Sequence, residues 1–229
     1  LLVLIVLILL IVNLIKPKPE KFTNLQLIYD DAYYITVERF IRRQKHMEKN
    51  ISKNNIQVSK FLGQDKKMLD IKRLEELQKD NIINNNIDLH TLKYNGSVAC
   101  FLSHILLWKK LLSEKGEIFL ILEDDCLILP DFNKKLNYNY QYVPKDWDML
   151  WLGHGKLKGK KINDKVLKPY NSPGMGYNSE HHCYLLKKKS IPKLFDFLLP
   201  INRTQSKDSI IRHNFEKFNA YFLIERLAI

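Results

Sequence analysis

The sequence predicts an α/β domain built on an open sheet, with a separate apolar segment at its N-terminus. The 229 residues are enough for one such domain and an appendage, but few for two full domains. Residues 118–122 form a continuous apolar run, as in a central strand that helices cover on both faces. An apolar helical stretch over residues 98–112 precedes this run, and a short turn at 114–116 joins the two. Sheets of this kind bind ligands outside the carboxyl ends of their strands.

The composition excludes several classes of protein. With 45% hydrophobic and 11% aromatic residues, the chain has ample material for a core and is not disordered, collagenous or of low complexity. Three cysteines without a C-x-x-C pair exclude a disulfide scaffold and a cysteine-ligated zinc site. The formal net charge of +12 favours an anionic partner, which is a nucleic acid, a membrane surface or a phosphorylated substrate.

The N-terminus carries a segment that is typical of membrane attachment. Residues 1–15 are aliphatic except for Asn13, and a Lys-Pro-Lys-Pro sequence follows at 16–19. A spanning helix needs about 20 apolar residues and a signal-peptide core about 7–15, but no A-x-A-like cleavage site follows. We therefore expect an uncleaved signal anchor over 1–15, a stalk over 16–24 and a catalytic domain over 25–229, on a single-pass membrane protein. The alternative is a buried N-terminal strand or helix of the core.

Local patterns predict the remaining elements. Apolar spacing, charge and capping residues indicate a strand over Leu25–Ile35, an exposed amphipathic helix over Glu38–Lys49, and helices over Lys66–Lys79, Val98–Leu112 with Ser97 as its N-cap, and Asp208–Phe218. Residues 156–193 hold ten lysines against Asp164 and Glu180. This stretch is predicted to be a flexible basic loop that closes over a diphosphate or faces anionic lipid, or else a solvated surface loop.

Three consecutive carboxylates, Glu123, Asp124 and Asp125, follow the buried strand. Neighbouring like charges raise each other's pKa, and a bound divalent cation is the simplest way to hold them together. If the strand persists, Glu123 and Asp125 project to the same side, and their oxygens suit Mn²⁺ or Mg²⁺ shared with a diphosphate. The alternative is a solvated acidic turn, or an N-cap for the next element.

The segment Ile121–Asp125, together with residues 96–104 and Trp108 before it, resembles glycosyltransferase family 25. That family holds the lipopolysaccharide-type and procollagen-type galactosyltransferases. Further matches follow in the family's order. They are residues 34–39 with Arg42 and Arg43, the Asp-Trp-Asp strand at 146–153, the strand at 182–186 with a helix after it over 190–199, and the acidic residue Asp208.

The resemblance implies a fold and a reaction. The fold would be of the nucleotide-diphospho-sugar (GT-A) type, with a mixed, mostly parallel sheet flanked by helices. Glu123, Asp124 and Asp125 would act as the DxD metal motif, with Glu123 and Asp125 as ligands to Mn²⁺ or Mg²⁺ and Asp124 at the donor. The reaction would be an inverting transfer of galactose or glucose from a UDP-sugar to a hydroxyl of a glycan or protein.

The candidate base and the candidate donor-binding residues each have a simpler structural explanation as well. Asp208 would be the general base, although a carboxylate in the first turn of a helix also favours the helix dipole. Glu38, Arg39 and Arg42 would meet the nucleotide or phosphates of the donor, although a solvated helix start explains them nearly as well.

Ser103 and His104 lie within the apolar helix and would line the donor site. A lone histidine in such a helix is otherwise a structural residue of the core.

Two competing functions fit the same residues. A metal-dependent phosphodiesterase would also use a carboxylate triplet and basic residues, but the sequence lacks the second acidic or histidine cluster of a two-metal site. A catalytically inactive sugar-binding or scaffold protein on a membrane is the other. Since the basic residues are accounted for by a phosphorylated donor or a membrane, we expect no specific nucleic-acid partner.

Overall fold

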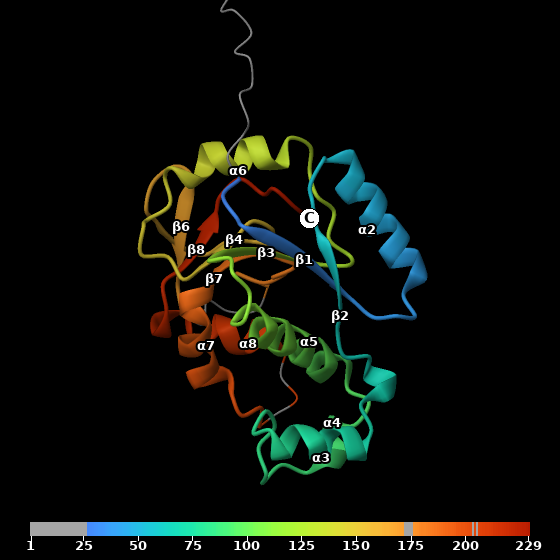
Figure 1. Ribbon diagram of the computed structural model, residues 1–229. Coiled ribbons are helices and arrows are strands. Elements are labelled where there is room, and N and C mark those ends of the chain that lie inside the picture. Colours follow the sequence, from blue (N-terminus) through green and yellow to red (C-terminus); the bar gives the residue numbers. More distant parts are fainter. Residues whose placement is uncertain (1–26, 172–175, 203, 205) are drawn as a thin grey trace, which may run out of the picture.

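The computed structural model describes residues 27–171, 176–202, 204 and 206–229 (Figure 1). The expected anchor over 1–15 and stalk over 16–24 lie outside these residues. Among the described helices, none has the length and apolarity that crossing a membrane requires.

Within the described residues, eight strands form one sheet in the order β2-β1-β3-β7-β4-β8-β6-β5. In chain order the strands are β1 (Asp31–Thr36), β2 (Ser59–Leu62), β3 (Ile118–Glu123), β4 (Met149–Trp151), β5 (Gly159–Lys161), β6 (Val166–Pro169), β7 (Cys183–Lys187) and β8 (Ala220–Leu223). The expected mixed sheet is confirmed, but the expectation that it is mostly parallel is wrong. Six strands run one way, but β7 and β6 are reversed inside the sheet, so four of the seven pairings are antiparallel.

This arrangement brings the carboxyl ends of β1, β3, β4 and β8 to one edge of the sheet, because these four strands share a direction. The reversed strand β7 lies between β3 and β4, so the residues that lead into β7 also reach that edge. The predicted basic loop over 156–193 is in part ordered, since it contains β5, β6 and β7.

Helices cover both faces of the sheet (Figure 1). One face carries α2 (Ile41–Lys53) and α6 (Phe132–Tyr140). The other carries α5 (Gly96–Leu111), α7 (Ile191–Leu198) and α8 (Lys207–Arg212), with α3 (Ile71–Lys79) and α4 (Leu89–Leu92) beyond them. The described residues also contain the short 3₁₀ turns η1 (Lys66–Met68), η2 (Lys188–Ser190) and η3 (Phe215–Lys217).

Strand β3 is the central buried strand that its apolar run predicts. Phe119 and Ile121 belong to the core on the α5 side, and Leu120 and Leu122 to the core on the α2 side. All four side chains are fully buried, because successive side chains of a strand point to opposite faces and helices cover both. The strand ends at Glu123, the first charged side chain after the apolar run.

Helix α5 confirms the predicted apolar helix, but its N-cap is Asn95 and not Ser97. The Asn95 side-chain oxygen accepts a hydrogen bond from the Val98 backbone N–H at 3.1 Å. The helix therefore begins at Gly96, two residues earlier than the apolar pattern indicates, since Gly96 and Ser97 are exposed and add nothing to that pattern.

Three other predicted boundaries are wrong for local reasons. The first strand begins at Asp31, because the Asp30 side chain instead accepts from the backbone N–H groups of Glu117 and Ile118. The predicted helix over 66–79 is broken by Asp70, which caps α3. The predicted helix over 208–218 ends at Arg212, and the Asn214 side chain donates to the Ile210 carbonyl just beyond.

Replacing the N-cap of α5 is expected to lower the stability of the domain. Asn95→Ala should cost about 1 kcal/mol of unfolding free energy, within the usual range of about 0.5–2 for a lost cap. Urea denaturation followed by circular dichroism measures this cost. Ser97→Ala is the matched control and should change the unfolding free energy by less than about 0.5 kcal/mol, as surface substitutions do. A larger loss in Ser97→Ala than in Asn95→Ala would contradict the assignment of the cap.

Candidate functional site

A cavity of about 290 Å³ opens at the carboxyl ends of β1 and β3. Its walls come from the end of β1, the start of α2, the loop before η1, the first half of α5 and the end of β3. The lining residues are Ile35, Thr36, Val37, Arg39, Phe40, Arg43, Gln64, Asp65, Lys66, Gly96, Ala99, Cys100, Ser103, His104, Glu123, Asp124 and Asp125. The cavity therefore lies where an open α/β sheet binds its ligands.

The three carboxylates at the end of β3 have three different environments. Asp124 is buried and uses both of its oxygens: it accepts from Thr36 Oγ1 at 2.6 Å and from Arg43 at 2.9 Å. The Asp125 side chain is 54% exposed and contacts Arg43 through one oxygen at 3.2 Å. Burial and the nearby charge of Glu123 raise the pKa of Asp125, so its carboxylate would be stabilised by additional positive charge.

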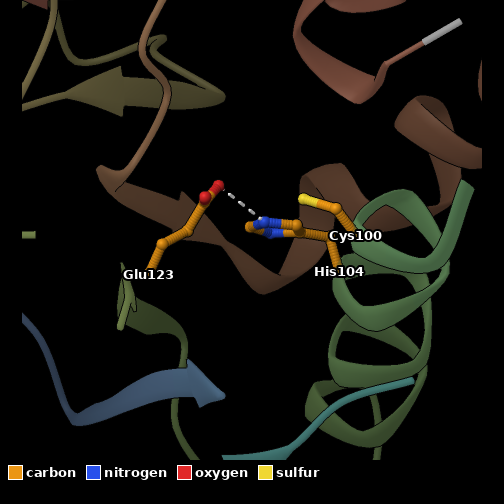
Figure 2. Close-up of side chains that lie close together, drawn as sticks. All are labelled: Cys100, His104 and Glu123. Carbon is orange, nitrogen blue, oxygen red and sulfur yellow. Dashed lines mark hydrogen bonds and ion pairs between the residues drawn. The ribbon is translucent and has the colours of Figure 1, made fainter. Parts of the chain in front are cut away.

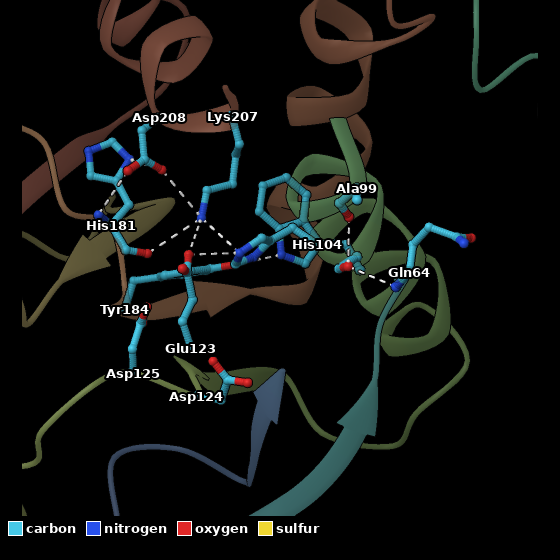
Figure 3. Close-up of polar contacts among 12 residues, drawn as sticks. Gln64, Ala99, His104, Glu123, Asp124, Asp125, His181, Tyr184, Lys207 and Asp208 are labelled. Atoms are coloured by element: carbon cyan, nitrogen blue, oxygen red, sulfur yellow. Dashed lines mark hydrogen bonds and ion pairs between the residues drawn. The ribbon is translucent and has the colours of Figure 1, made fainter. Parts of the chain in front are cut away.

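Glu123 turns away from the cavity mouth toward a buried ammonium (Figure 3). The Lys207 Nζ lies 3.1 Å from Glu123 Oε1 and 2.9 Å from His104 Nε2. It also lies 3.4 Å from an oxygen of Asp208 and 3.4 Å from the His181 carbonyl oxygen. Lys207 is only 2% exposed, so its charge is held by these partners and not by water.

The opposite charges in this cluster favour the ionised form of each of its three groups. Burial opposes ionisation of Glu123, but the charge of Lys207 outweighs it, and the pKa of Glu123 is lowered to about 2. Burial would also raise the pKa of Asp208, yet His181 and Lys207 hold it well below its usual value. Burial disfavours the charged form of Lys207, but Glu123 and Asp208 more than compensate and raise its pKa.

His104 is part of the same network and is neutral. Burial and the charge of Lys207 lower its pKa. His104 Nε2 lies 2.9 Å from Lys207 Nζ and 3.0 Å from Glu123 Oε1. Because an ammonium only donates, the contact to Lys207 requires His104 Nε2 to accept, with the proton on Nδ1. The Lys207 ammonium then donates to both Nε2 and the Glu123 oxygen, and no hydrogen lies between these two acceptors. Nδ1 lies 2.7 Å from the Tyr184 hydroxyl, which also accepts from Trp108 Nε1 at 3.0 Å. Both ring nitrogens of His104 therefore have partners inside the protein.

The structure brings most of the expected site residues to one cavity. Among the donor residues, Arg39, Ser103, His104 and Asp124 line it, as do the expected metal ligands Glu123 and Asp125. The Ser103 hydroxyl donates to the Ala99 carbonyl and accepts from the Gln64 backbone N–H, so it fixes the loop before η1.

Other expected residues lie outside the cavity lining. Glu38 and Arg42 are exposed, and their assignment to the donor stays a prediction. Asp208 reaches the cavity only through Lys207. Arg39 is paired with Asp65 at 2.6 Å, and this hydrogen bond lowers the pKa of Asp65.

Sequence reasoning missed the cations that neutralise the acidic cluster. Lys207 follows a polar stretch and is flanked directly by Ser206 and Asp208, so the adjacent residues do not indicate burial. Arg43 belongs to the family-like segment but was given no role of its own. Tyr184 is hidden in an apolar strand. A buried tyrosine hydroxyl needs a hydrogen-bond partner, and this requirement is the signal that points to Tyr184.

The donor atoms available for a metal ion divide into an inner and an outer set. In the described part of the chain, Cys100, His104 and Glu123 form one group whose ligand atoms lie within 4.8 Å of one another (Figure 2). Lys207 already contacts two members of this inner set. The outer set would be Asp125 and the second oxygen of Glu123, which offer the carboxylate oxygens that Mn²⁺ and Mg²⁺ prefer. Asp124 does not fit, because both of its oxygens are already bonded.

Known proteins share this sequence pattern. Human procollagen galactosyltransferase 2 is 23% identical over 201 residues, which cover 83% of this chain but 31% of that protein. The lipooligosaccharide biosynthesis protein lic2B of Haemophilus influenzae is 27% identical over 169 residues, 71% of this chain and 61% of that protein. A mouse protein named inactive glycosyltransferase 25 family member 3 is 24% identical over 218 residues, 89% of this chain and 35% of that protein.

The chain thus spans less than two thirds of the length of these relatives. Among solved structures, the apo form of the glycosyltransferase GlyE of Streptococcus pneumoniae superposes with a TM-score of 0.43 and 14% identity, over 83% of this chain and 44% of that one. The sequence profile described as glycosyltransferase family 25 (LPS biosynthesis protein) matches residues 30–211. That match includes the acidic end of β3 as well as Lys207 and Asp208, and it shows that the chain belongs to glycosyltransferase family 25.

Proposed function

We propose that this chain is a metal-dependent, inverting hexosyltransferase of the GT-A type, which moves galactose or glucose from a UDP-sugar to a hydroxyl of a glycan or protein. The observation that carries the proposal is the acidic end of β3. In a chain of this family, three carboxylates end a buried strand and line a cavity that also presents Arg39 and Arg43. A sugar diphosphate needs both kinds of group, cations for its phosphates and carboxylates for a metal ion.

The donor half of the reaction would use the cavity at β1 and β3. Arg39 and Arg43 stack on the Phe40 ring, with their guanidinium carbons 4.4 and 5.0 Å from its centre, so the two cations are held at the cavity wall. Asp125 and Glu123 would hold Mn²⁺ or Mg²⁺, which when bound supplies positive charge to the departing diphosphate. Asp124 would orient Arg43 and the end of β1 through its two hydrogen bonds.

The acceptor half of the reaction would use Asp208 as general base. Asp208 accepts from the His181 backbone N–H at 3.1 Å, and the neighbouring Glu180 lines a second hollow of about 630 Å³ at the ends of β4 and β8. An acceptor hydroxyl placed between the two cavities would give its proton to this carboxylate as it attacks the sugar. The low pKa of Asp208 makes it a weaker base than a free carboxylate. An experiment on Asp208 therefore has to separate proton transfer from its structural role as a partner of Lys207.

The relative named as inactive favours a second candidate function, an inactive sugar-binding or scaffold protein. Lys207 and Arg43 already neutralise much of the acidic cluster, as a protein without a metal would also require. Stabilisation by UDP that depends on Mn²⁺, measured by thermal unfolding, separates the transferase from this candidate and from a phosphodiesterase. The proposed transferase should be stabilised by the two together more than by either alone.

Removing the outer metal ligand is expected to abolish donor binding. Asp125→Asn should weaken the Mn²⁺-dependent affinity for UDP by more than about tenfold, because losing even an outer partner of a metal site costs about that much. Calorimetric titration with UDP and Mn²⁺ measures this loss. Asp164→Asn, an exposed carboxylate far from the cavity lining, is the control and should bind like the parent. Parental UDP affinity in Asp125→Asn would rule out the metal assignment.

Removing the candidate base should affect transfer but not donor binding. Asp208→Asn is expected to keep near-parental Mn²⁺-dependent affinity for UDP while losing roughly 10²–10⁴-fold in transfer rate, the usual contribution of a general base. The two quantities come from calorimetry and a sugar-transfer assay, with Glu216→Gln as an exposed control in the following segment. If Asp208→Asn transfers sugar at the parental rate, Asp208 is not the base.

We also propose that residues 1–15 anchor the chain in a membrane. The full chain is expected to sediment with membranes and to resist carbonate extraction, because fourteen of the first fifteen residues are aliphatic and such a stretch binds lipid strongly. A shortened chain beginning at Lys21 should remain in the supernatant and keep its activity. Aggregation or unfolding of the shortened chain would show that the apolar run belongs to the core.

A further inference from the structure

The ammonium of Lys207 sits among atoms that would otherwise suit a metal ion. Cys100 Sγ, His104 Nε2 and an oxygen of Glu123 lie within 4.8 Å of one another, and sulfur, imidazole nitrogen and carboxylate are all ligands of divalent transition metals. Lys207 Nζ lies 2.9 Å from His104 Nε2 and 3.1 Å from Glu123 Oε1. These are hydrogen-bond distances, so no space is left for a metal ion between the same atoms.

Two further contacts fix the position of this ammonium. An oxygen of Asp208 and the carbonyl oxygen of His181 both lie 3.4 Å from Lys207 Nζ. The partners come from α5, β3, α8 itself and the segment before β7 (Figure 3). A side chain that is 2% exposed and held from four segments is a fixed charge of the site.

We propose that Lys207 is a positioning residue that acts as an internal cation and keeps metal ions out of the inner set Cys100, His104 and Glu123. By holding Glu123 through Oε1, it leaves the second oxygen of that carboxylate as the one that could join Asp125 in binding a divalent cation. A cation bound through Glu123 would thereby be confined to the side of the carboxylate away from Lys207. This inference deepens the proposed function, because that is the side on which a donor diphosphate would be bound.

Removing the ammonium should therefore open the inner set to metal. In Lys207→Ala, Co²⁺ added without nucleotide should bind at least about tenfold more tightly than to the parent, since a neighbouring positive charge is lost and two of the three ligands, His104 and Glu123, become free. The Cys100 thiol would lose its proton on binding, so a thiolate-to-cobalt absorption band should appear. The parent should bind Co²⁺ without this band.

Two control variants separate this effect from a general change of charge. Lys66→Ala removes the same charge from the exposed rim of the cavity and should leave Co²⁺ affinity within about twofold of the parent, because exposed charges are screened. Adding Cys100→Ser to Lys207→Ala should abolish the absorption band. A thiolate band in the parent, or unchanged Co²⁺ binding in folded Lys207→Ala, would overturn the proposal.

Lys207→Ala leaves Glu123 and Asp208 without their counter-ion, so that variant can fail to fold. The parent then provides the decisive measurement. An ammonium that donates to His104 Nε2 requires the proton of His104 on Nδ1, which ¹⁵N nuclear magnetic resonance of the ring detects directly. An Nε2–H tautomer would overturn the proposal. Both measurements use no sugar donor, so a parent that fails to transfer sugar would count against the proposed function and leave the assignment of Lys207 standing.

Discussion

A strand that is buried on both faces must end at a polar residue, and the way this residue is neutralised organises the site. Strand β3 is buried through Leu122, and Glu123 follows before the chain reaches solvent. A carboxylate in that place is costly unless a positive charge and hydrogen bonds compensate it. Lys207 supplies the charge, and the position of α8 over the edge of the sheet follows from this requirement.

The same requirement gives the acidic cluster a built-in asymmetry. Glu123 is committed on its inner side and Asp124 on both oxygens, whereas Asp125 keeps one oxygen for solvent or a ligand. Carboxylates that look equivalent in the sequence therefore differ in what they can do. The negative charge of the clustered carboxylates favours a bound metal ion. Lys207 and Arg43 neutralise part of that charge, and only the remainder is available to a ligand.

The sequence is a good guide wherever one residue pattern decides the outcome. The apolar run before Glu123 predicts a doubly covered strand, and the site does lie at its carboxyl end, because burial and strand direction are both encoded locally. The cap at Asn95 was missed, since an apolar pattern does not register the exposed first turn of a helix. Lys207 was missed for a different reason. Its burial depends on the reversed strand β7, which brings His181 and α8 to the end of β3, and no local pattern encodes that pairing.

The contact between Glu123 and Lys207 joins residues that are 84 positions apart. During synthesis, β1, α5 and β3 leave the ribosome well before α8, since chains emerge from the N-terminus onward. Until then, Glu123 has no buried partner of opposite charge and no reason to leave water. The edge of the sheet therefore stays open and hydrated on the nascent chain. Lys207 can close this edge only after α8 has been made, so the site of the first half of the domain is completed later than its strands.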